Sequence, residues 1–232
     1  MGGFIQRFAR FIAACSIGLM GGPLVSWAGK PFELIVVALG DSTTAGTPEF
    51  RSPAEVPPSG AGDARSQYAY WVMTRHPEWQ VVNRGIAGER SDEILQRFAS
   101  DVVAHRPQAV VILAGVNDLY QGYPVRWVTE HLERMYQAAA EARIPVLACT
   151  VMPYNGMSDA VRGRMAEVNA WIRAYSAEHH LTLCDLFTVM EDPSAPGRLI
   201  NTVDGLHPDV EGYRRMGEAV TEVLERLVAS WR

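Results

Sequence analysis

Five mostly apolar runs, each four to eight residues long, are separated by longer and more polar stretches of the chain. Their aliphatic and β-branched residues are continuous and do not alternate with polar ones, which is typical of strands covered on both faces, as in a parallel sheet. We therefore predict buried parallel strands at residues 32–39, 80–83, 109–114, 144–150 and 181–186.

Apolar residues at helical spacing follow these strands. We expect Ser91 to be the N-cap of the first such helix, because Asp92 and Glu93 suit the positive end of a helix. The predicted core-facing stripes are Ile94, Leu95, Phe98 and Val102; Trp127, Val128, Leu132, Met135 and Ala139; Met165, Val168, Ile172 and Tyr175; and Val210, Tyr213, Met216, Val220, Leu224 and Leu227.

Strands that alternate with helices and are joined by right-handed crossovers predict an α/β fold. We expect a three-layer α/β/α sandwich with a central five-stranded parallel sheet in the flavodoxin-like order 2-1-3-4-5. In such folds the functional site lies beyond the carboxyl ends of the strands, so the residues that follow each strand are the candidates for chemistry.

The N-terminal segment differs from the rest of the chain. Arg7 and Arg10 precede a mostly apolar stretch over residues 11–25, and small residues flank Trp27 in Ser26-Trp27-Ala28. This pattern predicts a signal peptide over residues 1–28, a single domain over residues 29–232, and export to the periplasm or the medium. An uncleaved membrane anchor is the less favoured alternative, because the apolar stretch is shorter than the ~20 residues that a spanning helix needs.

The composition is that of an ordinary globular domain, with 232 residues, 48% of them hydrophobic, and a formal net charge of -5. There is no run of Lys and Arg, which argues against a nucleic-acid partner. Cys149 and Cys184 lie in apolar runs, and we expect them to be buried free thiols, although export would permit a disulfide between them.

Polar residues and glycines stand where strands are expected to end. Ser42 lies in a glycine-bounded turn after the first strand, Gly88 follows the second, and Asn117 follows the third. Near the C-terminus, Asp204 precedes His207 by three residues, a spacing that lets a carboxylate orient an imidazole on one turn. Each feature alone is common in turns, but their occurrence together at successive strand ends favours a nucleophilic site.

These four segments resemble the sequence blocks of the SGNH (GDSL-like) hydrolase family. The matching residues are Gly40-Asp41-Ser42, Gly88, Gly115-Val116-Asn117-Asp118 and Asp204-Gly205-Leu206-His207. The sequence Gly-Glu-Arg-Ser that begins at Gly88 favours this glycine over Gly85 as the block residue. Thr43 departs from the family pattern, in which Leu is the commonest residue after the nucleophile. The resemblance covers nearly all of residues 29–232, which we therefore expect to form an SGNH hydrolase domain.

The resemblance implies a serine esterase or lipase that forms an acyl-enzyme. Ser42 would be the nucleophile, His207 its base and Asp204 the residue that orients His207, while Gly88 and Asn117 would donate to the oxyanion together with the Ser42 N–H. We expect no metal or cofactor to be needed.

The substrate is left open by the sequence. The partner is expected to be a small-molecule, lipid or sugar ester, and a carbohydrate O-acetylesterase, an acyltransferase, a lysophospholipase or a thioesterase would use the same residues. Tyr120, Tyr123 and Trp127 follow the Asn117 block and are candidates for an acyl pocket, a sugar platform or ordinary packing. The segment from Thr47 to Asp63, rich in Pro and Gly, is either a loop that overhangs the site or a surface insertion.

Overall fold

The computed structural model describes residues 33–231, so the predicted signal peptide lies outside the described residues. Its main sheet has five parallel strands in the order β4-β1-β5-β6-β7. In chain order of the five predicted strands this is 2-1-3-4-5, so the predicted fold class and strand order are confirmed. The strands are β1 (Leu34–Gly40), β4 (Trp79–Gly85), β5 (Ala109–Leu113), β6 (Val146–Cys149) and β7 (Thr182–Cys184).

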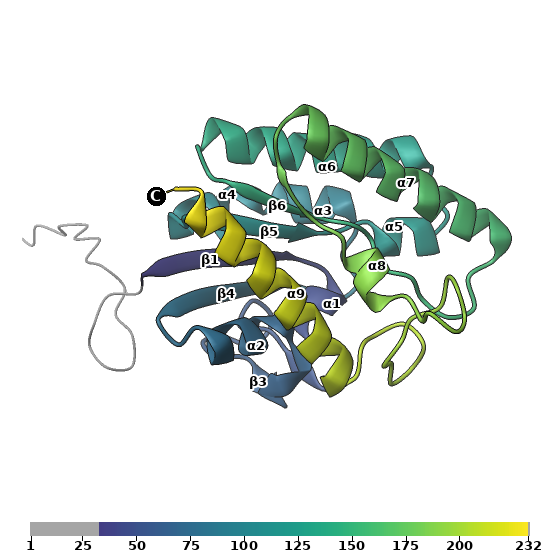
Figure 1. Ribbon diagram of the computed structural model, residues 1–232, viewed down its shortest axis with the longest axis horizontal. Helices are drawn as coiled ribbons and strands as arrows, with labels where there is room; N and C mark the ends of the chain where they lie inside the picture. The colour runs from purple at the N-terminus through teal and green to yellow at the C-terminus, as the bar shows by residue number, and fades with distance from the viewer. Residues whose placement is uncertain (1–32, 232) are drawn as a thin grey trace, which may run out of the picture.

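Helices cover both faces of this sheet (Figure 1). One face carries α2 (Tyr68–Arg75) and α9 (Val210–Ala229), and the other carries mainly α3 (Ser91–Gln96), α6 (Val125–Glu141) and α7 (Asp159–Glu178). The remaining elements are short: α1 (Ser42–Ala45), α4 (Phe98–Asp101), α5 (Val116–Tyr120), α8 (Leu186–Met190), the 3-10 turns η1 (Ala64–Ser66) and η2 (Val103–His105), and a two-stranded ribbon of β2 (Phe50–Arg51) and β3 (Ala61–Gly62).

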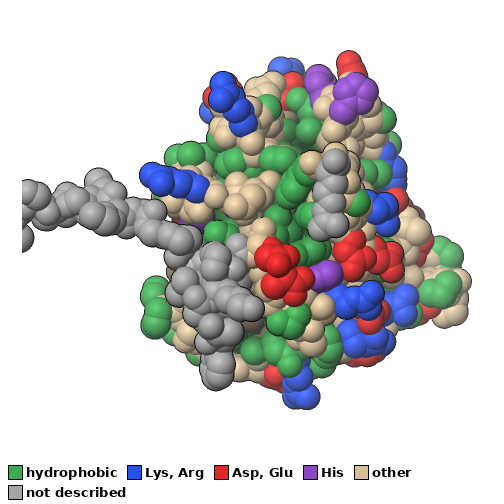
Figure 2. All heavy atoms as spheres, turned by 60° about the vertical axis from the view of Figure 1, so that its left-hand side comes forward, with side chains coloured by type: hydrophobic (Ala, Val, Ile, Leu, Met, Phe, Trp, Pro, Cys, Tyr) green, Lys and Arg blue, Asp and Glu red, His purple; other side chains and the backbone are tan. Residues whose placement is uncertain are grey.

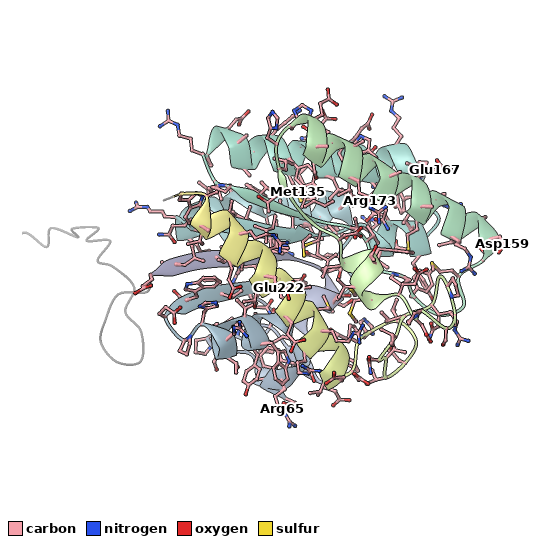
Figure 3. The ribbon with its side chains drawn as sticks, in the orientation of Figure 1. Arg65, Met135, Asp159, Glu167, Arg173 and Glu222 are labelled. Carbon is pink, nitrogen blue, oxygen red and sulfur yellow. The ribbon has the colours of Figure 1, made fainter. Side chains whose placement is uncertain are left out.

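The core consists of two apolar layers, one on each side of the sheet. Val36 and Ala38 face Tyr68 and Tyr213 on one side, while the alternate residues of β1 face the other layer. That second layer includes Met135, which is fully buried and points from α6 towards the sheet (Figure 3). The continuous apolar strands of the sequence are explained by this double coverage.

Strand register brings the candidate residues to one edge of the sheet. Gly40 is the register partner of both Gly85 and Leu113, so β1, β4 and β5 end level with one another. Because parallel strands all point the same way, the loops that follow them meet there. The chain ends near the opposite edge, away from α1 (Figure 1).

One predicted detail is wrong. Ser91 is not an N-cap but the first residue of α3, and its side chain donates to Asp118 instead of capping its own helix. The last helix, α9, has Asp209 as its N-cap, and the Asp209 carboxylate accepts the N–H of Gly212 at 2.8 Å.

Cys149 and Cys184 are register partners on β6 and β7, and both are free and buried, as expected. The hydrogen bond with the Cys184 thiol, together with burial, raises the pKa of Cys149 well above its usual range. A buried thiol of raised pKa is a poor nucleophile.

The charged side chains on the surface are of mixed sign. On the face turned forward in Figure 2, acidic side chains gather in the centre, with Lys and Arg around them. Between residues 33 and 231, no helix has the combination of length and apolar character that crossing a bilayer requires.

Candidate active site

The turn after β1 presents Ser42 at the start of the one-turn helix α1. The Asp41 carboxylate accepts the N–H of Thr43 at 3.0 Å and caps this helix, and Gly46 ends it in the left-handed conformation with φ of 111°. A Cβ on Gly40 would lie 2.4 Å from the carbonyl oxygen of Leu113, so the close approach of β1 and β5 requires glycine here. The tightness of this turn leaves the Ser42 side chain at the carboxyl end of the sheet.

The loop before α9 brings His207 to Ser42 from 165 residues away in the chain. The Nε2 atom of His207 lies 3.0 Å from Oγ of Ser42. On the other side of the ring, Nδ1 lies 2.7 Å from Oδ2 of Asp204. The remaining carboxylate oxygen of Asp204 accepts the backbone N–H groups of Leu206 and His207 at 2.8 and 2.7 Å. The carboxylate is thus fixed by its own loop.

The carboxyl groups of Asp41 and Asp204 have opposite pKa shifts. Desolvation would raise the pKa of Asp204, but hydrogen bonds from the His207 ring and from two backbone N–H groups outweigh it and lower the pKa. Burial raises the pKa of Asp41 to about 7, and the charge of Asp118 acts in the same direction. Asp204 is therefore the anionic carboxylate beside the imidazole at neutral pH.

Gly88 lies in a tight turn after β4. Its φ of 82° is the positive value that the third position of a type II turn requires, and a Cβ there would meet no atom within 4 Å. Gly85, by contrast, lies against α1, where a Cβ would approach the Ala45 nitrogen to 2.1 Å. Among residues 33–231, the N–H of Gly88 makes no hydrogen bond, so it is free to meet a ligand.

Asn117 and Asp118 lie in α5 and connect it to the Gly88 turn. The side-chain amide of Asn117 donates one hydrogen bond to the Glu89 carbonyl at 2.8 Å, which leaves its second N–H unused. Asp118 accepts both the backbone N–H and the hydroxyl of Ser91, at 2.9 and 2.7 Å. These contacts tie the loops after β4 and β5 together.

Residues that the sequence reasoning missed also support the site. Arg97 donates to the carbonyl oxygens of Gly40 and Arg84, and Glu55 accepts the N–H of Ala87 at 3.0 Å. The only sequence signal for Arg97 is a charge within the apolar stripe over residues 94–102, and no sequence signal points to Glu55.

The Thr47–Asp63 segment is a folded extension and not a loose insertion. It contains the β2–β3 ribbon, and the hydroxyl of its fully buried Ser52 donates to the Gly85 carbonyl at 2.5 Å. This extension therefore packs beside the Gly88 turn.

Two hollows of different size border the site. A cavity of about 10 Å³ lies against Asp41, with walls that include Val151 and Leu206. A wider groove of about 530 Å³ borders Asp204 and is lined by Tyr120 and Tyr154, among others. Over residues 33–231 there is no group of three or more His, Cys, Asp or Glu side chains that could hold a metal ion.

The chain matches the model of one protein family and a known enzyme. The model of the GDSL-like lipase/acylhydrolase family matches residues 38–215. An acetylxylan esterase of Geobacillus stearothermophilus is 31% identical over 74 residues, which are 32% of this chain and 33% of that protein. The matched segment thus spans about a third of this curated relative.

Solved structures match over a much larger part of the chain. A protein described as lipolytic and of the G-D-S-L family, from Desulfitobacterium hafniense, is 26% identical with a TM-score of 0.68, and the match covers 82% of this chain and 99% of that one. An acetyl-xylooligosaccharide esterase from Geobacillus is 20% identical with a TM-score of 0.65, and the match covers 83% and 94% of the two chains. The second likeness is one of fold alone.

Proposed function

Because the chain belongs to the GDSL-like lipase/acylhydrolase family, we propose that it hydrolyses carboxylic esters with Ser42 as its nucleophile. The observation that carries this proposal is the continuous hydrogen-bonded series from the Ser42 hydroxyl through the His207 ring to Asp204, with distances of 3.0 and 2.7 Å. An imidazole within reach of a hydroxyl, and itself oriented by a carboxylate, is the arrangement that activates a serine.

In the first half of the reaction, Oγ of Ser42 attacks the ester carbonyl carbon while Nε2 of His207 takes the hydroxyl proton. Asp204 holds Nδ1–H and stabilises the imidazolium that forms. His207 then returns the proton to the leaving alcohol oxygen as the C–O bond breaks, which leaves an acyl group on Ser42. Water attacks this acyl-enzyme in the same way, with His207 again as base, and the acid is released.

The negative charge on the tetrahedral intermediate needs donors that are in position before the reaction. We assign this role to the N–H groups of Ser42 and Gly88 and to the second amide N–H of Asn117. Ser42 is the first residue of α1, and the N–H groups of a first helical turn have no acceptor inside the helix. The free N–H of Gly88 supports the same assignment.

The test is hydrolysis of p-nitrophenyl acetate by the purified protein and by Ser42→Ala, His207→Ala and the double variant. Each single variant should lose nearly all turnover, and the double variant should lose no more, because the two residues act as one unit. Ser66→Ala is the matched control, since Ser66 is also buried but its hydroxyl has no hydrogen-bond partner among residues 33–231. Ester turnover that survives in Ser42→Ala would refute the proposal.

We further propose short acyl esters of carbohydrates as the substrate class. We infer that the hollow of about 10 Å³ beside Asp41 receives the acyl group, and a hollow of this size favours acetyl over long acyl chains. The groove beside Asp204 carries two tyrosine rings 5.8 Å apart, one of them, on Tyr120, 65% exposed. Aromatic rings at the edge of a polar groove suit the faces of sugar rings. The acetylxylan esterase of Geobacillus stearothermophilus that is 31% identical over 74 residues supports the same class.

The substrate class is tested with p-nitrophenyl esters from acetyl to octanoyl and with an acetylated xylooligosaccharide. Turnover should fall with chain length, and Tyr120→Ala should raise KM for the oligosaccharide but not for p-nitrophenyl acetate. Trp231→Ala is the control, because Trp231 is also an exposed aromatic residue but does not line the groove. Product analysis with and without added alcohol separates hydrolysis from acyl transfer, and a preference for octanoyl esters would contradict the acetyl assignment.

A further inference from the structure

Four of the five backbone N–H groups in residues 86–90 donate hydrogen bonds, and within the described part of the chain the N–H of Gly88 does not. The N–H of Ile86 donates to the Gly40 carbonyl at 3.2 Å, and the N–H of Arg90 donates to the Glu93 carboxylate at 2.9 Å. The Glu89 carbonyl accepts from Asn117. These bonds fix the two ends of the turn and leave its tip to be held by side chains.

Glu55 holds the tip from the side of the Thr47–Asp63 extension. One of its carboxylate oxygens accepts the N–H of Ala87 at 3.0 Å, and the other accepts the N–H of Ser52 at 3.1 Å. The carboxylate therefore bridges the extension and the residue that immediately precedes Gly88. The extension itself is anchored beside it by the Ser52 hydroxyl on Gly85.

Arg97, between α3 and α4, also holds the turn. Its Nε donates to the Glu89 carboxylate at 2.6 Å, and its two terminal nitrogens donate to the carbonyls of Arg84 and Gly40 at 2.7 and 2.8 Å. It also donates to Asp101 at 2.7 Å, and its side chain is only 12% exposed. One planar guanidinium thus connects the end of β1, the end of β4 and the residue after Gly88.

From these contacts we propose that Glu55 and Arg97 are positioning residues, which hold the Gly88 N–H where the oxyanion forms. The inference rests on the proposed function. Donors stabilise a transition state best when they need no reorganisation during the reaction, and a glycine turn without side anchors would be mobile. Glu55 and Arg97 do not touch the substrate in this scheme and act only through the turn.

Glu55→Ala is the decisive variant, because Glu55 is half-buried on the extension, outside both layers of the core. Loss of a whole oxyanion donor costs about 10²–10³ in kcat, so a loosened donor should cost about 10- to 100-fold, with KM within about twofold. The inhibition constant of a trifluoromethyl ketone, which adds reversibly to Ser42 and forms the oxyanion, should rise by the same factor. Glu55→Gln keeps one acceptor oxygen, so its kcat and its inhibition constant should lie between those of the wild type and those of Glu55→Ala.

Glu49→Ala is the matched control on the same extension, because the exposed Glu49 carboxylate has no hydrogen-bond partner within residues 33–231. Arg97→Lys should also lower kcat, since one ammonium cannot span the acceptors that the guanidinium reaches. Its control is Arg126→Lys on the exposed face of α6.

The two proposals fail in different ways. If the wild type does not hydrolyse esters, or if Ser42→Ala does, the proposed function is wrong. If those results are as expected but Glu55→Ala keeps kcat and ketone affinity within about twofold of the wild type, the positioning role is overturned and the function is not. Should Arg97→Lys fail to fold, Glu55→Ala alone decides the question.

Discussion

Replacing Asp204 by Asn alters one atom beside His207 and is expected to reverse the tautomer of the ring. One carboxylate oxygen of Asp204 accepts two backbone N–H groups, from Leu206 and His207. In the variant only the amide oxygen can fill that position, so the NH₂ group must face Nδ1 of His207. Nδ1 then accepts a hydrogen bond, the ring proton moves to Nε2, and Nε2 can no longer take the proton of Ser42.

The expected loss of kcat in Asp204→Asn depends on how exposed the Asp204 carboxylate is. In a triad whose Asp is buried, the same change lowers kcat by about 10⁴, or about 5 kcal/mol. The side chain of Asp204 is 42% exposed, so water competes for the ring nitrogen and weakens the constraint. We therefore expect a loss of about 10³ in kcat, or about 4 kcal/mol, with little change in KM.

The assay is the initial rate of p-nitrophenyl acetate hydrolysis over a range of concentrations, with thermal melting to show that the variant folds. Asp209→Asn is the matched control, because Asp209 lies on the same loop as the N-cap of α9 and Asn serves that role equally well. An Asp204→Asn enzyme within about tenfold of wild-type kcat would refute the tautomer argument.

Three further outcomes follow from other parts of the molecule. Asn117→Ala should lower kcat by about 10²–10³, and a change confined to KM would contradict its oxyanion role. Hydrogen bonds from His76 to Glu225 and Glu78 raise the His76 pKa above 6.5 against an opposing desolvation effect. The two hydrogen bonds of protonated His76 therefore stabilise the folded protein fully below pH 6.5. This stabilisation is lost as the pH rises through the pKa of His76 in the folded state. In urea unfolding, His76→Gln should cost more at about pH 6 than at about pH 9, by about 1 kcal/mol after allowance for solvent screening, and an equal cost would refute the linkage. Leu132→Ala, fully buried on α6, should lower the free energy of unfolding by about 2–5 kcal/mol in the same assay, and a smaller loss would show that the cavity collapses.

The fold could be predicted in most respects from the sequence because its signals are local and strong. Runs such as Ala109–Leu113 have no polar residue, and only a strand covered on both faces buries such a run completely. The error concerning Ser91 fell at a helix end. Ser91 has the composition of an N-cap, but Asp118 offers its hydroxyl and its N–H an acceptor from another loop, and only the folded chain brings that acceptor near.

Some features of the candidate site could likewise be predicted from the sequence, and others could not. The approach of Asp204 to His207 takes place within one turn, so three-residue spacing was enough to predict it. The roles of Gly85 and Gly88 could not be assigned by composition, because Gly85, the last residue of β4, is required by the neighbouring α1, whereas Gly88 is required by its own φ.

By itself, then, the sequence determined the strands, the helix stripes and the short motifs at the strand ends, since these depend on residues close together in the chain. Only the tertiary structure decided that His207 meets Ser42 and that Glu55 and Arg97 flank the Gly88 turn. The reason is physical: a carboxylate or guanidinium on a loop acquires its partners through sheet register and helix packing, and neither leaves a pattern in the neighbouring residues.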